Sequence, residues 1–264
     1  MESYISIFDK NESTVDDKLK QKLINLAQKY EVHDFVLQDP SQFLFWYDGF
    51  PEFKNACNVE CAAFVAAMLS FGNRKQFIPK IREILEYSLD EGGIARWCLN
   101  GAKNFPAGTQ KFYRFYSYDD LHTLFDEMAE ILKESDSLGE HFRKIYQNDD
   151  KIPLHRIVSL CFPKSAIVPK GKNSANKRVN MFLRWMIRQN SPVDLGIWTW
   201  ASPKELIIPL DVHVMQQAIK LNLLPENASA SLKTAQTLTA KLSEVFPDDP
   251  VRADYALFGL GISS

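Results

Sequence analysis

The chain has 264 residues, of which 45% are hydrophobic and 24% charged, so it can bury a large core as an ordinary soluble protein. Its formal net charge of -2 excludes a uniformly basic protein, so any polyanion site must be a local patch. No apolar run reaches the roughly 18 residues that suggest a membrane span. The first 14 residues lack the pattern of a signal peptide, so we expect a cytoplasmic protein without a membrane partner.

Apolar residues recur at helical spacing along most of the chain, and no strand alternation of useful length appears. We therefore predict an all-α fold. The aromatic and turn-rich end of segment 1–54 suggests an N-terminal covering segment, and 87–108 reads as a loop. Asn58, Ser174 and Asp211 are the expected N-caps of their helices. The predicted helices cover 15–31, 58–71, 75–88, 119–135, 175–189, 212–221, 231–245 and 251–261.

The four cysteines and five histidines give no metal-site pattern. Cys57 and Cys61 lie four apart on an apolar helix without a second close pair, and no two histidines have HxxxH spacing. Reduced, mostly buried thiols are the better interpretation. We expect neither a metal nor another cofactor.

The charge pattern changes sharply in the middle of the chain. Helix 119–135 is acidic on one face, whereas 151–193 holds nine lysines and arginines and no Asp or Glu. One interpretation is a binding surface for a polyanion, with the amides of the polar loop around Lys170 and the following helix start suited to phosphate. The alternative is that these cations pair with the acidic helix.

Lys177 and Asp211 each stand at a predicted helix start, and two such starts can face one cleft. The helix dipole disfavours a cation in the first turn, which favours a neutral, nucleophilic amine at Lys177. A capping carboxylate accepts backbone N–H groups, which favours the ionised form of Asp211. The plain alternatives are a solvated lysine and a helix cap worth about 1 kcal/mol.

Several stretches resemble the helix-hairpin-helix DNA glycosylases, the endonuclease III superfamily. Pro209–Val214, which reads PLDVHV, resembles the family's (V/P)-D-x-H-V segment, and the Lys177 helix resembles the one that carries the Schiff-base lysine of bifunctional members. The apolar helix from Asn58 is similar to the family's apolar helix that ends in a polar turn at the DNA, and the terminal DYALFGLGIS is similar to its closing helix. The likeness covers about 55–264. It is nearest to an uncharacterised bacterial family with a KR-N-FLRWM-R core, and resembles the archaeal 8-oxoguanine DNA glycosylases.

One motif departs from the family pattern. Where members have Leu-Pro-Gly-x-Gly-x-Lys, this chain reads Val168 to Lys177, VPKGKNSANK, with Asn173 and Ala175 where the glycines would be. Those glycines let backbone amides approach a phosphate closely. The departure puts the hairpin geometry and the register of Lys177 in question, with Lys172 as the alternative nucleophile.

The resemblance implies a single unit, 1–264, of two helical lobes with a central cleft, acting as a monomer on double-stranded DNA that contains a damaged base, such as an oxidised purine. Lys177 attacks C1′ of a flipped-out nucleotide, Asp211 stabilises the sugar cation, and a Schiff base permits β-elimination. The DNA-binding residues are then Lys170, Gly171, Lys172, Asn173, Arg178 and Asn73. Trp198, Trp200 and His213 line the substrate pocket, although the two tryptophans fit a core role equally well.

Three other functions remain open on the sequence. The chain can be a monofunctional glycosylase in which Asp211 activates water and Lys177 binds phosphate. It can be a non-catalytic nucleic-acid-binding module, or an interaction protein whose basic segment pairs with its own acidic helix. Salt-dependent binding to duplex DNA separates the last of these from the others.

Overall fold

The computed structural model describes residues 15–149 and 151–263, and its fold is predominantly α-helical. Short 3-10 helices connect the α-helices: η1 (His33–Gln38), η2 (Pro40–Gly49), η3 (Pro51–Phe53), η4 (Leu89–Glu91), η5 (Pro203–Glu205) and η6 (Pro250–Arg252). In chain order the α-helices are α1 (Asp17–Tyr30), α2 (Ala56–Leu69), α3 (Arg74–Tyr87), α4 (Ile94–Leu99), α5 (Tyr118–Glu134), α6 (Leu138–Asn148), α7 (Leu154–Leu160), α8 (Lys177–Ile187), α9 (Val212–Lys220), α10 (Leu232–Leu242) and α11 (Ala253–Ser263).

All of the predicted helices are present, most with ends shifted by one to three residues. Two predicted caps are wrong. Asn55, not Asn58, caps α2, and Asn58 lies inside the helix, where its buried amide bonds Phe53, Gly92 and Ala95. Ser174 does not cap α8, because the chain enters this helix through Asn176 in a left-handed conformation.

The predicted loop at 87–108 contains a helix, α4, and a small antiparallel hairpin follows it. Strand β1 (Lys111–Tyr113) pairs with β2 (Tyr116–Ser117). Helix α4 is six residues long, and its N-cap is Gly93, whose φ of 106° is unfavourable for any residue with a side chain. These elements are too short to show a periodic pattern, so the sequence gives no clear sign of them.

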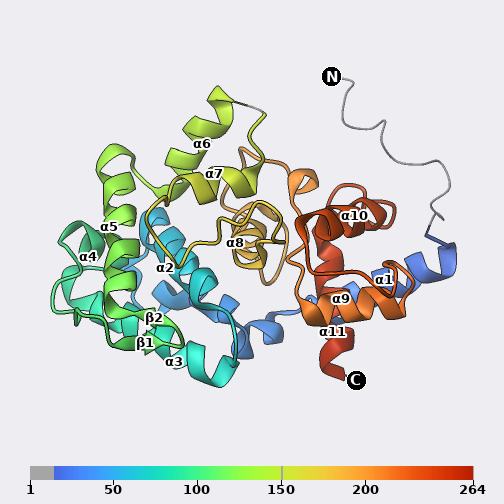
Figure 1. Cartoon of the computed structure of the whole chain (residues 1–264), viewed down its shortest axis with the longest axis horizontal. Helices are drawn as coiled ribbons and strands as arrows, with labels where there is room; N and C mark the ends of the chain where they lie inside the picture. The colour runs from blue at the N-terminus through green and yellow to red at the C-terminus, as the bar shows by residue number, and fades with distance from the viewer. Residues whose placement is uncertain (1–14, 150, 264) are drawn as a thin grey trace.

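Helix α8 lies between two groups of helices (Figure 1). On one side it contacts α2 and α7, and on the other its arginines reach α11. Helix α2 is buried along almost its whole length, as a nearly all-apolar sequence requires. Among the described residues, no helix is both long and apolar enough to cross a bilayer.

The described part of the expected covering segment 1–54 divides between the two groups. Helix η2 packs against α2, while α1 packs against the closing helix α11, so the two ends of the described chain lie together. Residues 1–14 of this segment lie outside the described part of the chain. The apolar stripe of α1, with Leu23 and Ala27 fully buried, faces this contact.

A buried carboxylate joins α2 to the other elements of its group. Glu60 is 3% exposed, and its two oxygens accept hydrogen bonds from Gly139 N at the start of α6 and from Trp198 Nε1, both at 2.8 Å. Burial raises the pKa of Glu60, although these two donors act against the rise. Gly139 is required here, because a Cβ at this position would collide with the Trp198 ring.

Candidate functional site

A cavity of about 650 Å³ opens where α8, α9 and α11 meet the connection between α2 and α3. Its volume is within the range of small-molecule sites. Apolar rings and charged groups share its lining. The residues used below are Phe35, Phe71, Gly72, Asn176, Lys177, Arg178, Arg184, Asp211, His213, Asp254 and Phe258.

Lys177 and Asp211 form an ion pair in this cavity, with Lys177 Nζ 2.8 Å from Asp211 Oδ2. They come from the first residue of α8 and the N-cap of α9, which lie 34 positions apart in the sequence. The Lys177 side chain is 34% exposed and that of Asp211 21% exposed, so a ligand in the cavity can reach both groups. This juxtaposition is what the sequence predicted for the two helix starts.

The two oxygens of Asp211 have different partners. Oδ1 accepts the Val214 N–H at 2.9 Å and caps α9, while Oδ2 faces Lys177. Burial acts to raise the pKa of Asp211, but Lys177, the Val214 amide and the nearby His213 outweigh burial and lower it. Asp211 is therefore an anion across the neutral range, as the capping argument predicted.

A second carboxylate, Asp254 of α11, lines the same cavity. Its Oδ2 bonds Arg184 Nη1, and the Arg184 guanidinium lies 4.6 Å from the centre of the Tyr255 ring. Burial raises the pKa of Asp254 to about 6 despite the ion pair, since Arg184 is shared with Asp194, whose Oδ1 lies 3.4 Å from Arg184 Nε. The cavity thus holds one firmly ionised carboxylate and one that titrates near neutral pH.

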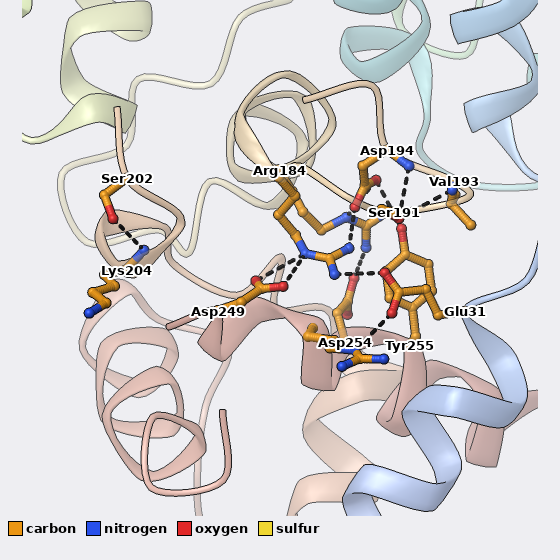
Figure 2. Close-up of polar contacts among 12 residues, drawn as sticks. Glu31, Arg184, Ser191, Val193, Asp194, Ser202, Lys204, Asp249, Asp254 and Tyr255 are labelled. Carbon is orange, nitrogen blue, oxygen red and sulfur yellow. Dashed lines mark hydrogen bonds and ion pairs between the residues drawn. The ribbon is translucent and has the colours of Figure 1, made fainter. Parts of the chain in front are cut away.

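Figure 2 shows acidic residues gathered around Arg184 in this buried network. Arg188, one helical turn after Arg184, extends the network to three further segments. Its Nη2 lies 2.6 Å from Glu31 Oε1 after α1, its Nη1 2.5 Å from Asp194 Oδ2, and its Nε 2.8 Å from Asp249 Oδ2 before η6. Tyr255 donates to Asp194 Oδ1 at 2.9 Å. The arginines of α8 thereby join α1, α8 and α11 into one unit.

These pairs change the interpretation of the basic segment 151–193. Arg184 and Arg188 are 4% and 2% exposed, so they cannot meet a polyanion at the surface. The alternative pairing with the acidic helix applies to Lys164, whose Nζ is 3.4 Å from Glu130. The two buried arginines pair instead with acidic residues outside the segment, which are Glu31, Asp194, Asp249 and Asp254.

The predicted DNA-binding residues are divided between exposed and internally bonded side chains. Gly171, Lys172 and Asn173 are exposed in the loop before α8, and Asn73 is exposed as the N-cap of α3. Lys170 instead directs its amine to the Ser165 carbonyl oxygen.

Arg178 is also held internally. It donates to the Met68 carbonyl oxygen at the end of α2 and to Tyr116 Oη at 3.2 Å. Its guanidinium lies 4.9 Å from the centre of the Phe71 ring and lines the cavity. In this arrangement Arg178 joins α8 to the end of α2.

The loop before α8 is irregular from Cys161 to Asn176, so a short hairpin between two helices is not seen at this point. Asn173 O accepts Leu232 N at 2.8 Å, which fixes the loop to the start of α10. Asn176 is 2% exposed with φ of 46°; its Nδ2 donates to Gly171 O at 3.0 Å, and its Oδ1 has no partner among the described residues. Asparagine tolerates this left-handed conformation better than most residues.

The two tryptophans predicted for the substrate pocket do not line the cavity. Trp198 is 2% exposed and bonded to Glu60, and its ring stacks on Trp200 with centroids 5.4 Å apart. Trp200 also packs on Tyr146. The core alternative is therefore correct for Trp198. His213, the third predicted residue, does line the cavity and is exposed.

Several cavity residues were missed by the sequence analysis. Asp254 and Phe258 lie on the closing helix, where the spacing of four places them on one face. The rings of Phe258 and Phe35 meet edge to face at 5.5 Å and give the cavity an aromatic wall. An acidic residue in a helix that is otherwise apolar was the available signal for Asp254. Among the described residues, no group of three or more His, Cys, Asp or Glu is placed to hold a metal ion.

The fold and the cavity define a predominantly α-helical protein with a lysine–aspartate pair at the meeting point of two helix starts. The chain matches the model of the family described as Protein of unknown function (DUF2400) over residues 39–263 and belongs to that family. Comparison with curated proteins and with solved structures gives no match.

Proposed function

We propose that this protein is a DNA glycosylase that removes a damaged base from duplex DNA and then cleaves the strand through a Schiff base on Lys177. The observation that carries the proposal is the contact of 2.8 Å between Lys177 Nζ and Asp211 Oδ2 at a ligand-sized cavity. An amine beside an ionised carboxylate supplies the nucleophile and the charge that this reaction requires.

The proposed chemistry uses both side chains in sequence. Lys177 loses a proton to solvent, and its lone pair attacks C1′ while the bond from C1′ to the base breaks. The electrons of that bond leave with the base, which takes up a proton from solvent. Asp211 stabilises the positive charge that develops on the sugar. Opening of the sugar ring gives an iminium between Lys177 and C1′. Loss of a C2′ proton then expels the 3′ phosphate, which is β-elimination.

The lining of the cavity suits a planar, polar ligand. Phe35 and Phe258 supply an aromatic wall, and the carboxylates of Asp211 and Asp254 supply acceptors. A flipped base is bound in enzymes of this kind by stacking and by hydrogen bonds to its edge. An oxidised purine, which carries additional N–H donors, is the lesion class that best fits two acceptors.

A second candidate is the monofunctional reaction, and the ion pair itself favours it. A lysine that holds its proton in a salt bridge is not a nucleophile, and in that state Asp211 would activate water while Lys177 contacts a phosphate. The two reactions differ in one intermediate, because only the reaction through a Schiff base forms a covalent protein–DNA complex.

The test is a panel of duplexes with oxidised, alkylated or deaminated bases, each incubated with the protein with and without borohydride. We expect base release from at least one duplex and a borohydride-dependent covalent complex with it. Base release without the complex would establish the monofunctional alternative. Release from no duplex, with or without binding, would overturn the proposed function.

A further inference from the structure

The tip of the β1–β2 hairpin presents an aromatic ring to solvent beside the cavity. Phe115 is 58% exposed, which is unusual for a phenylalanine on a short, well-ordered turn. Arg114, the other residue of the tip, is also exposed and has φ of 53°. The hairpin packs beside α3 at the edge of the molecule, far from α7 and α10 (Figure 1).

The exposed ring is held in place by its neighbours. Its centroid lies 4.5 Å from that of Tyr116 and 5.3 Å from that of Phe71, and Lys111 Nζ donates to the Phe115 carbonyl oxygen at 2.8 Å. Tyr113 Oη donates to the Phe71 carbonyl oxygen at 2.5 Å, which joins the hairpin to the α2–α3 connection. One face of a fixed aromatic ring therefore remains available to a ligand.

The hairpin tip is continuous with the cavity that holds Lys177. Phe71 lines that cavity, and the guanidinium of Arg178, the residue after Lys177, lies over the Phe71 ring. The Arg114 guanidinium lies 5.8 Å from the centre of the same ring. A Cβ on Gly72, another lining residue, would collide with Arg114, so the tip borders the cavity directly.

We propose that the hairpin tip, Arg114–Phe115, contacts DNA, and that the Phe115 ring stacks on a base next to the nucleotide that enters the cavity. The identity of this partner rests on the proposed function. A fixed apolar ring flanked by a cation suits a disrupted base step, because the ring replaces lost stacking while the cation meets a phosphate. Leu160, another large exposed apolar side chain, is not part of the cavity lining.

The test uses a duplex with a tetrahydrofuran abasic site and a 2-aminopurine on the opposite strand, whose fluorescence rises when it is unstacked. Phe115→Ala removes the ring from an exposed position, Phe115→Tyr keeps an aromatic ring, and Leu160→Ala is the matched control at 54% exposure. We expect Phe115→Ala to lose most of the fluorescence rise and to bind the abasic duplex roughly tenfold more weakly. The Tyr and Leu160 variants should resemble the wild type.

A Phe115→Ala protein that matches the wild type in both readouts, or a Leu160→Ala protein that loses as much, would overturn the hairpin inference. Base release is followed in parallel on the lesion duplexes. Fluorescence that depends on Phe115 in a protein that releases no base would leave the hairpin contact standing and remove the glycosylase proposal. If base release and the fluorescence rise are both the same in Phe115→Ala as in the wild type, the glycosylase proposal stands and the hairpin inference is wrong.

Discussion

Asp211 has two structural roles, because one of its oxygens caps the N-terminus of α9 and the other faces the amine of Lys177. A cap alone would be satisfied by asparagine, whereas stabilisation of a cation needs the charge. Lys177 and Asp211 could be placed in one site because helix starts are readable from polar residues before apolar stripes, whereas His213 was implied only by the resemblance. Trp198 was misplaced because the residues that bury its ring, Glu60 and Phe142 among them, come from distant parts of the chain.

Replacing Asp211 with asparagine separates these two roles. We expect the Asp211→Asn protein to unfold in urea within about 1 kcal/mol of the wild type near neutral pH, since asparagine caps as well and the ion pair is partly exposed. Base release in single-turnover assays should fall at least about a hundredfold. A variant with full activity would reduce Asp211 to a cap.

The two cavity carboxylates should respond to pH in opposite directions. Lys177 and the Val214 amide lower the pKa of Asp211 against the effect of burial, so its contribution to stability is present above its ordinary pKa of 3.8 and is lost as the pH falls below it. Burial raises the pKa of Asp254 to about 6, so the folded protein binds a proton that the unfolded chain releases between 3.8 and about 6. Asp254 therefore makes stability decline as the pH rises through that window.

The Asp254→Asn variant tests the second of these statements. We expect the free energy of unfolding of the wild type, relative to the variant, to decrease between about pH 4 and about pH 6 and to stay level above it. Urea titrations at several pH values measure this difference. A difference that increases over the same window would mean that Arg184 holds Asp254 ionised.

At the scale of elements, the arginines of α8 explain why the basic segment is not simply a surface patch. Helical periodicity predicted the apolar stripe of α8, but it does not distinguish buried arginines such as Arg184 and Arg188 from solvent-exposed ones. Their partners Glu31 and Asp254 come from distant parts of the chain, and pairing over such sequence distances leaves no local signal. The same limit applies to α4 and the hairpin, which are too short for periodicity.

The Arg188 network should contribute strongly to stability. Arg188→Met keeps the length of the side chain but leaves three carboxylates without their shared cation, at a cost of about 3 to 5 kcal/mol. Lys204→Met is the matched control, because Lys204 pairs with Asp248 on the surface at 60% and 88% exposure. An Arg188 variant as stable in urea as the control would contradict this role.

The loop before α8 should bind DNA through one of its two lysines. Lys172→Ala should weaken binding to duplexes of any sequence and reduce the slope of log affinity against log salt by about one. Lys170→Ala should leave that slope unchanged, since its amine is bonded to the Ser165 carbonyl oxygen. Equal changes in slope for the two variants would show that Lys170 leaves its internal partner on binding.

At the scale of the whole molecule, two distant segments complete the site. Helix α1 packs on α11, which supplies Asp254 and Phe258 to the cavity, and Phe35 of the N-terminal segment lines the cavity directly. The all-α class followed from periodicity and is confirmed. The arrangement of the helix groups was expected only from the resemblance, because composition and spacing do not report which helices meet.

The central claim is that Lys177 is the nucleophile, and the most direct measurement is the site of the covalent complex. The protein is incubated with its lesion duplex in borohydride, digested, and analysed by mass spectrometry for the lysine that carries the reduced sugar. We predict the modification on Lys177 in the wild type and no covalent complex with Lys177→Gln, which still binds the duplex. Modification of Lys172 instead, or a complex that persists in Lys177→Gln, would contradict the account.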